Sequence, residues 1–192
     1  MRPIGRLILL QVQRTTLKTG VKPDRTYDPA PLLHVPRAAV SPDGVMGWSD
    51  RDAWVVDIHH RAHPSTKNGD GVHGVSVGFT SHYEAMRDRF GDIMTVGCAG
   101  ENMIAETDTM ITWEAIARGL VITGTDGTEK VRLTALKAAE PCRPFTAWAQ
   151  GRQVESKVLK ENLQFLQDGM RGFYLQAESS AFVEPGDILS AM

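Results

Sequence analysis

Short runs of β-prone residues, each closed by a turn signal, constrain the fold of this chain more than any other feature. The clearest pair is Leu120–Thr123 and Lys130–Ala138, which flank Asp126-Gly127. An Asp-Gly pair between β-prone runs predicts a hairpin. Further strands are expected at Arg6–Val12, Ala53–Ile58, Val72–Phe79, Phe173–Ala177, Phe182–Val183 and Ile188–Ser190. Many short strands joined by turns are typical of a barrel, so we predict a mainly β fold, a closed β-barrel with a few peripheral α-helices.

Two segments carry the periodicity of an α-helix. Tyr83, Met86 and Phe90 recur at helical spacing, and Ser81-His82-Tyr83-Glu84 fits a capping box at the start of this first helix. The second is an amphipathic helix predicted from Val154 to Gln167, with an apolar stripe along one side. Neither helix is long enough to organise the fold, so both are expected to lie against the barrel.

Four prolines make the segment from about residue 14 to residue 37 irregular. Pro23, Pro29, Pro31 and Pro36 exclude a regular helix and disfavour a central strand. An extended arm that wraps the domain and a disordered segment both agree with this pattern. Since 192 residues suit one domain and no internal repeat is present, we predict a single domain spanning residues 1–192.

Composition excludes several classes of protein. Lys and Arg number 21 against 23 Asp and Glu, which lacks the basic excess of a dedicated nucleic-acid binder. No apolar run approaches the roughly 20 residues that cross a bilayer. Two cysteines are too few for a disulfide framework. We therefore expect a cytoplasmic protein with free thiols and with no nucleic-acid or membrane partner; the sequence carries no signal of its oligomeric state.

The pentapeptide Glu140-Pro141-Cys142-Arg143-Pro144 holds the first candidate for chemistry. It follows a predicted strand, and its two prolines hold the cysteine in a stiff loop. The thiolate is the reactive and metal-binding form of cysteine, and the adjacent Arg143 favours ionisation. The alternative is that Cys142 is a small buried hydrophobe. Cys98, within Gly97-Cys98-Ala99-Gly100, is expected to be a buried thiol in a tight connection between strands.

Histidines near one aspartate form a further candidate. The members are Asp57, His59, His60 and His63, with His73 further along the chain. Imidazoles beside a carboxylate are common ligands of transition metals. However, His59 and His63 would share a face only on a helix, and Pro64 and the preceding strand argue against one. We therefore predict a solvated cluster at the end of a strand, with a zinc site as the alternative.

Three motifs follow one another in a distinctive order. They are Gly100-Glu101-Asn102-Met103, then Glu140-Pro141-Cys142, then Arg171-Gly172-Phe173-Tyr174 leading to Gly186-Asp187. This order resembles the MOSC family, named for the C-terminal domain of molybdenum cofactor sulfurases. The similarity covers about half of the chain, from Gly97 to the C-terminus. Upstream, the segment from Gly44 to Asp50 only loosely resembles a family motif, and His59–Pro64 replaces a glycine pair.

The resemblance implies a MOSC-type β-barrel that handles the molybdenum cofactor, molybdopterin. Cys142 would be the functional thiol and the metal ligand, while Gly100, Glu101, Asn102 and Arg143 would lie at the cofactor. Pyridoxal phosphate belongs to a separate domain of the full-length sulfurases, so it is not expected on this chain.

Several functions agree with these residues. The first is an oxidoreductase in which Cys142 ligates molybdenum and the metal reduces a small-molecule substrate, such as an N-hydroxylated compound. The second is a sulfur carrier or transferase with a persulfide on Cys142, which would need a sulfur donor or acceptor protein as partner. The third is a barrel that binds without catalysis, and a zinc hydrolase built on the histidines comes last. We expect an enzyme of the first or second kind.

Overall fold

A closed barrel of seven strands forms the centre of the computed structural model, which describes residues 1–49, 51, 53–151 and 155–192. In order around the barrel the strands are β14 (Ile188–Ala191), β10 (Leu120–Thr123), β11 (Glu129–Ala138), β12 (Phe173–Ala177), β8 (Val75–Phe79), β9 (Met103–Glu106) and β1 (Arg2–Gln13). The antiparallel pairing of β1 with β14 closes the ring. The prediction of a mainly β closed barrel is confirmed.

The barrel interior is filled by alternate residues of its strands, because successive side chains of a strand point to opposite faces. Val131 and Leu133 of β11 are buried in this way, and so are Phe173 and Leu175 of β12. In β8 all five residues are buried, which marks a strand covered on both faces. β8 and β9 run parallel and are joined through α1 (Thr80–Phe90), whereas the other barrel neighbours are antiparallel.

The Asp-Gly signal marks a real hairpin between β10 and β11, although the loop is longer than a two-residue turn. The amide of Gly124 donates to the carbonyl of Thr128, so residues 124–128 form the connection. Gly127 takes a positive φ of 82°, while Asp126 keeps a negative φ and accepts a hydrogen bond from the Thr128 amide. The sequence therefore located the hairpin, and only its glycine needed the left-handed conformation.

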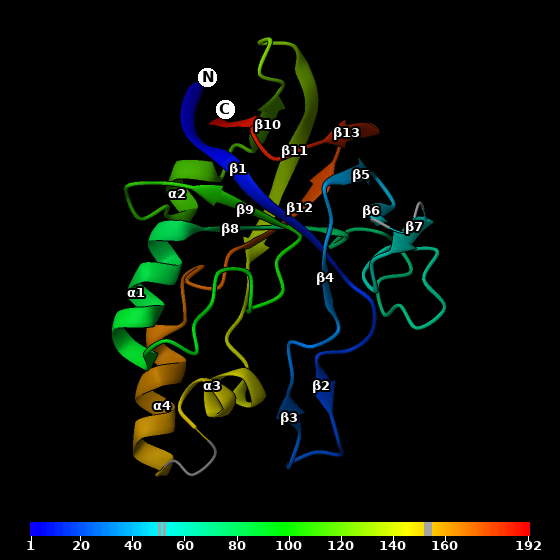
Figure 1. Cartoon of the computed structure of the whole chain (residues 1–192). Helices are drawn as coiled ribbons and strands as arrows, with labels where there is room; N and C mark the ends of the chain where they lie inside the picture. The colour runs from blue at the N-terminus through cyan, green and yellow to red at the C-terminus, as the bar shows by residue number, and fades with distance from the viewer. Residues whose placement is uncertain (50, 52, 152–154) are drawn as a thin grey trace.

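A smaller sheet and a hairpin flank the barrel (Figure 1). The sheet has the order β13 (Ala181–Val183), β5 (Arg37–Ser41), β6 (Gly44–Ser49) and β7 (Ala53–Val56). The proline-containing segment 14–37 holds three short strands, β2 (Lys18–Thr19), β3 (Thr26–Tyr27) and β4 (Leu32–His34). β4 pairs with the end of β1, while β2 and β3 form a hairpin that extends away from the end of the barrel where both termini lie. This arm therefore has regular elements that its prolines concealed.

In the described ranges four helices lie outside the barrel: α1, α2 (Trp113–Ile116), α3 (Arg143–Ala149) and α4 (Ser156–Phe165). A second apolar cluster, including Tyr83, Met86, Phe145 and Leu166, packs α1 and α3 against the rest of the molecule. Val154, the expected start of the last helix, lies outside the described residues. The sequence missed α2 and α3 because helices of this length show too few turns to reveal a period. No helix in the described part of the chain is long and apolar enough to cross a membrane.

The capping box expected at the start of α1 is wrong. The helix begins at Thr80, its N-terminal capping residue is Phe79, and no side chain caps it. Ser81 lies inside the first turn, where its hydroxyl donates to the Thr109 carbonyl at 2.9 Å and lies 2.8 Å from the Thr107 hydroxyl. Because α1 begins at Thr80, Ser81 is past the capping position, and its hydroxyl bonds to the segment after β9 instead of accepting an amide of the first turn.

Candidate functional site

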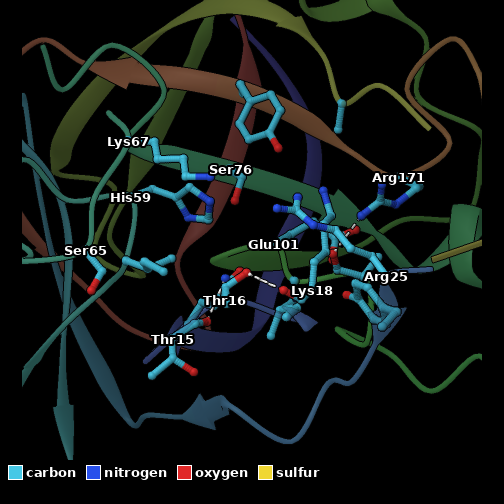
Figure 2. Close-up of a pocket in the computed structure, with 18 residues that line it drawn as sticks. Thr15, Thr16, Lys18, Arg25, His59, Ser65, Lys67, Ser76, Glu101 and Arg171 are labelled. Atoms are coloured by element: carbon cyan, nitrogen blue, oxygen red, sulfur yellow. Dashed lines mark hydrogen bonds between the residues drawn. The ribbon is translucent and has the colours of Figure 1, made fainter. Parts of the chain in front are cut away.

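A cavity of about 510 Å³ lies between one end of the barrel and the β2–β3 hairpin (Figure 2). Its walls come from the end of β1, the hairpin, the loop after β7, the loop before β9 and the start of β12. Segments far apart in the chain therefore meet here, because closing the barrel brings these strand ends to one rim. A volume of this size suits a cofactor or a small molecule.

The cavity is strongly positive. Lys18, Arg25, Lys67 and Arg171 line it, and Glu101 is the single carboxylate residue among the described lining residues. Figure 2 shows Lys67 on one side of the cavity and Lys18, Arg25 and Arg171 on the other. Converging guanidinium and ammonium groups favour an anionic ligand, and phosphate in particular.

Arg171 connects this cavity to Cys142. Its Nη1 donates to the Glu140 carbonyl at 3.2 Å and lies 3.6 Å from Cys142 Sγ, while Nη2 donates to the Ala99 carbonyl at 3.1 Å. The guanidinium also stacks over the ring of Phe145, 4.3 Å from its centroid. Three fixed contacts and a stacked face hold this cation in one orientation, with its charge beside the sulfur.

The charge balance around Arg171 agrees with this geometry. Burial alone would lower the pKa of Arg171, but the negatively charged forms of Cys142, Tyr27 and Tyr174 raise it above its ordinary value. Burial also raises the pKa of the Tyr174 phenol, and the positive charge of Arg171 acts in the opposite direction. The guanidinium is therefore the permanent positive charge of this wall, and the phenols are neutral.

Cys142 occupies the residue before α3, directly after the loop that leaves β11. Its backbone is extended, its side chain is partly buried, and its carbonyl accepts the Thr146 amide in the first turn of the helix. Cys142 is not one of the described residues that line the cavity. It touches Arg171, and Arg171 lines the cavity. Pro144 sits in the first turn of α3, where a missing amide proton costs nothing, so the stiff loop expected here is a helix start.

Arg143, the neighbouring cation expected to act on Cys142, is exposed on the surface of α3. The cation at the sulfur is Arg171, which lies 29 residues away in the sequence. The signal that could have found it was present, since Arg171 opens the Arg-Gly-Phe-Tyr motif. Proximity in sequence favoured Arg143, whereas the pairing of β11 with β12 brings Arg171 to the thiol.

Gly100 and Glu101 line the cavity as well. Gly100 has a φ of 98°, a conformation that only glycine adopts readily. Glu101 is buried, its Oε2 accepts the Tyr83 hydroxyl at 2.6 Å, and its Oε1 has no partner in the described part of the chain. Burial raises the pKa of Glu101, although Tyr83 and Arg171 act in the opposite direction. This carboxyl group is thus poised to hold a proton and to bond a ligand.

Asn102 lies behind the cavity wall and not on it. Its Oδ1 accepts both the amide and the hydroxyl of Ser76 at 3.0 Å, and its Nδ2 donates to Asp57 Oδ2 at 3.0 Å. Ser76 in turn is a lining residue. Asn102 therefore fixes the wall through a buried network that joins β8 to the loop after β7.

The histidines separate into different environments. His59 lines the cavity, and its Nδ1 lies 2.9 Å from Asp57 Oδ1. The Nδ1 atoms of His60 and His63 accept amides two residues further along, and the His73 ring packs edge-on against Tyr174. Within the described ranges, no three His, Cys, Asp or Glu side chains gather as metal ligands would. The sequence did not foresee that His59 alone would reach the cavity.

The chain is similar to a known family in sequence and to solved proteins in structure. The family model described as MOSC domain matches residues 71–190. The YuaD protein from Bacillus subtilis has a TM-score of 0.61 at 12% identity, over 98% of this chain and 96% of that one. YiiM from Geobacillus stearothermophilus has a TM-score of 0.53 at 15% identity, over 100% and 74%. YiiM from Escherichia coli has a TM-score of 0.55 at 9% identity, over 97% and 69%. No curated protein sequence matches the chain.

Proposed function

This chain belongs to the MOSC domain family, and on that premise we propose that its cavity binds the molybdenum cofactor, with the Cys142 thiolate as a ligand of the metal. The proposed activity is that of an oxidoreductase acting on a small molecule, such as an N-hydroxylated compound. When bound, the cofactor supplies a metal that exchanges two electrons with the substrate. The observation that carries the proposal is the contact of Arg171 with Cys142 Sγ at the edge of the cavity.

The residues present fit such a cofactor in three respects, namely the cations of the cavity, the buried polar atoms and the thiol. The cations Lys18, Arg25 and Lys67 match the phosphate of molybdopterin. Three buried polar atoms on the cavity residues lack a partner among the described residues, namely Arg25 Nε, Arg171 Nε and Glu101 Oε1. Because a buried polar atom without a partner costs free energy, these atoms favour a ligand rich in donors and acceptors, as a pterin is.

Cys142 offers the donor that the metal requires. Thiolate is a soft ligand, suited to a metal that already carries dithiolene sulfur. Arg171 beside the sulfur limits its movement. Glu101, whose pKa is raised by burial, offers Oε1 as a hydrogen-bonding atom to the ligand.

The test is the metal content of the protein purified from its native host, in wild type and in two matched cysteine variants. We expect about one molybdenum per chain in wild type and in Cys98→Ser, and none in Cys142→Ser, since serine is a hard, weakly acidic ligand. Thermal unfolding of each variant checks that the fold survives. Molybdenum retained by Cys142→Ser contradicts the ligand assignment. Sulfane sulfur on Cys142 without molybdenum contradicts the oxidoreductase and supports the sulfur carrier.

A further inference from the structure

We propose that His59, held by Asp57, is the proton donor of this site and protonates the oxygen that leaves when an N-hydroxylated substrate is reduced. This inference rests on the proposed function. It assigns a role to residues away from Cys142 and Arg171, on a part of the chain where the sequence predicted a solvated cluster, with a zinc site as the alternative.

Asp57 is fully buried and accepts four hydrogen bonds. Oδ1 accepts from the His59 amide at 2.8 Å and lies 2.9 Å from His59 Nδ1. Oδ2 accepts from the Gln13 amide at 2.6 Å and from Asn102 Nδ2 at 3.0 Å. Three of these groups can only donate, and the contact of Oδ1 with Nδ1 is a hydrogen bond when Nδ1 carries the proton. Asp57 therefore fixes one tautomer of His59, as a carboxylate does for the histidines of many active sites.

The other ring nitrogen, Nε2, is then the one left for the cavity. His59 lines the cavity from the same side as Lys67, opposite Arg171 (Figure 2). A substrate held between these two sides would have Arg171, which touches Cys142, on one side and the imidazole on the other. Asp57 holds the ring through Nδ1, and the imidazolium form donates from Nε2.

A proton donor must regain its proton from water in every turnover, so it needs contact with solvent. This need distinguishes His59 from the other ionisable groups of the cavity. The His59 side chain is 38% exposed, whereas Glu101 is buried. The phenols of Tyr27 and Tyr174 have pKa values raised by burial. The other charged lining groups are Lys18, Arg25, Lys67 and Arg171, which are much weaker acids than an imidazolium.

The reaction balances as R₂N–OH plus two electrons and two protons giving R₂NH and water. The N–O bond breaks, and its electron pair leaves with the oxygen, which takes the proton from His59 Nε2 and departs as water. The two electrons would be supplied by the cofactor when bound, which an external electron-transfer protein would reduce again. They form the new electron pair on nitrogen, which takes the second proton from solvent. His59 regains its proton from water through its exposed edge.

The first experiment needs no activity and uses imidazole NMR of the purified protein. We expect a strongly hydrogen-bonded Nδ1 proton that disappears in His59→Gln and persists in His63→Gln. His63 is a matched control, because it lies four positions further along the same loop, contacts backbone groups and does not line the cavity. A neutral His59 that carries its proton on Nε2 would overturn the inference.

The second experiment measures reduction of an N-hydroxylated amidine, together with molybdenum content. We expect His59→Ala to keep its molybdenum and its KM while kcat falls about 100-fold, a typical contribution of a general acid. Free imidazole added to the assay should restore part of the rate, whereas His63→Ala should behave as wild type. Unchanged kcat in a molybdenum-loaded His59→Ala overturns this inference alone. Wild-type protein without molybdenum or without reductase activity overturns the proposed function and the inference together.

Discussion

Replacing Gly172 with alanine tests why the Arg-Gly-Phe-Tyr motif needs its glycine. Gly172 has a φ of 83°, and a Cβ at this position would meet the Val77 carbonyl oxygen well inside contact distance and lie 3.1 Å from Glu101 Cγ. The obstacle is backbone of the neighbouring strand β8, which is paired with β12. A side chain here can be accommodated only by moving the two strands apart.

Two costs add for Gly172→Ala. The left-handed backbone costs an alanine about 1–2 kcal/mol, and overpacking against a fixed neighbour costs about 1–3 kcal/mol more. We therefore expect the free energy of unfolding to fall by about 2–5 kcal/mol, a large part of the roughly 5–15 kcal/mol that stabilises most domains. At a slope of about 2 kcal/mol per molar urea, the unfolding midpoint drops by roughly 1–2.5 M.

Gly127→Ala is the matched control for this measurement. Its φ of 82° is nearly the same, but a Cβ there has no neighbour within 4 Å. Only the backbone cost applies, so we expect a loss of about 1–2 kcal/mol in urea unfolding. The difference between the two variants isolates the close approach of Gly172 to β8. Equal losses for Gly172→Ala and Gly127→Ala would refute the reasoning.

Three further outcomes follow from the buried groups of the site. Because burial raises the pKa of Glu101, the folded state keeps this proton to higher pH than the unfolded state, so stability is lost as pH rises above about 4.5. Glu101→Gln should flatten that loss in urea titrations across pH, and an unchanged profile would contradict it. Burial, reinforced by the charge of Glu101, raises the pKa of the Cys98 thiol to about 12. Iodoacetamide at neutral pH should therefore modify Cys142 and leave Cys98 unmodified. Comparable labelling of both thiols, measured by mass spectrometry, would disprove this. Asn102→Ala removes the donor to Asp57 and the acceptor for the Ser76 amide of β8. The free energy of unfolding in urea should therefore fall by about 2–4 kcal/mol. A loss below about 1 kcal/mol would show that the network is dispensable.

Much of the strand content could be predicted because it depends on local signals. The β-prone run Leu120–Thr123 and the Asp-Gly pair after it locate a hairpin whatever the rest of the chain does. The capping box at Ser81 shows the limit of such signals. In the structure α1 starts one residue earlier, at Thr80, so Ser81 lies inside the first turn and its hydroxyl bonds to the segment after β9 instead of capping the helix.

The motifs identified Cys142 as a candidate, but they did not identify its partner. Arg171 stands 29 residues from Cys142, and Asp57 stands 45 residues from Asn102. The first pair meets because β11 and β12 are neighbours in the barrel, and the second because the loop after β7 is bonded to the end of β1. Both arrangements are set by the packing of the whole chain.

The sequence by itself determined where most of the barrel strands and the helices α1 and α4 form, which thiol sits after a strand, and the order of the motifs. The tertiary structure alone decided which cation reaches that thiol and that His59 faces the cavity. The physical reason is the range of the interactions. Backbone propensity and turn chemistry act over a few residues, whereas ion pairs and buried hydrogen bonds act over a few ångströms in space, between residues that the sequence places far apart.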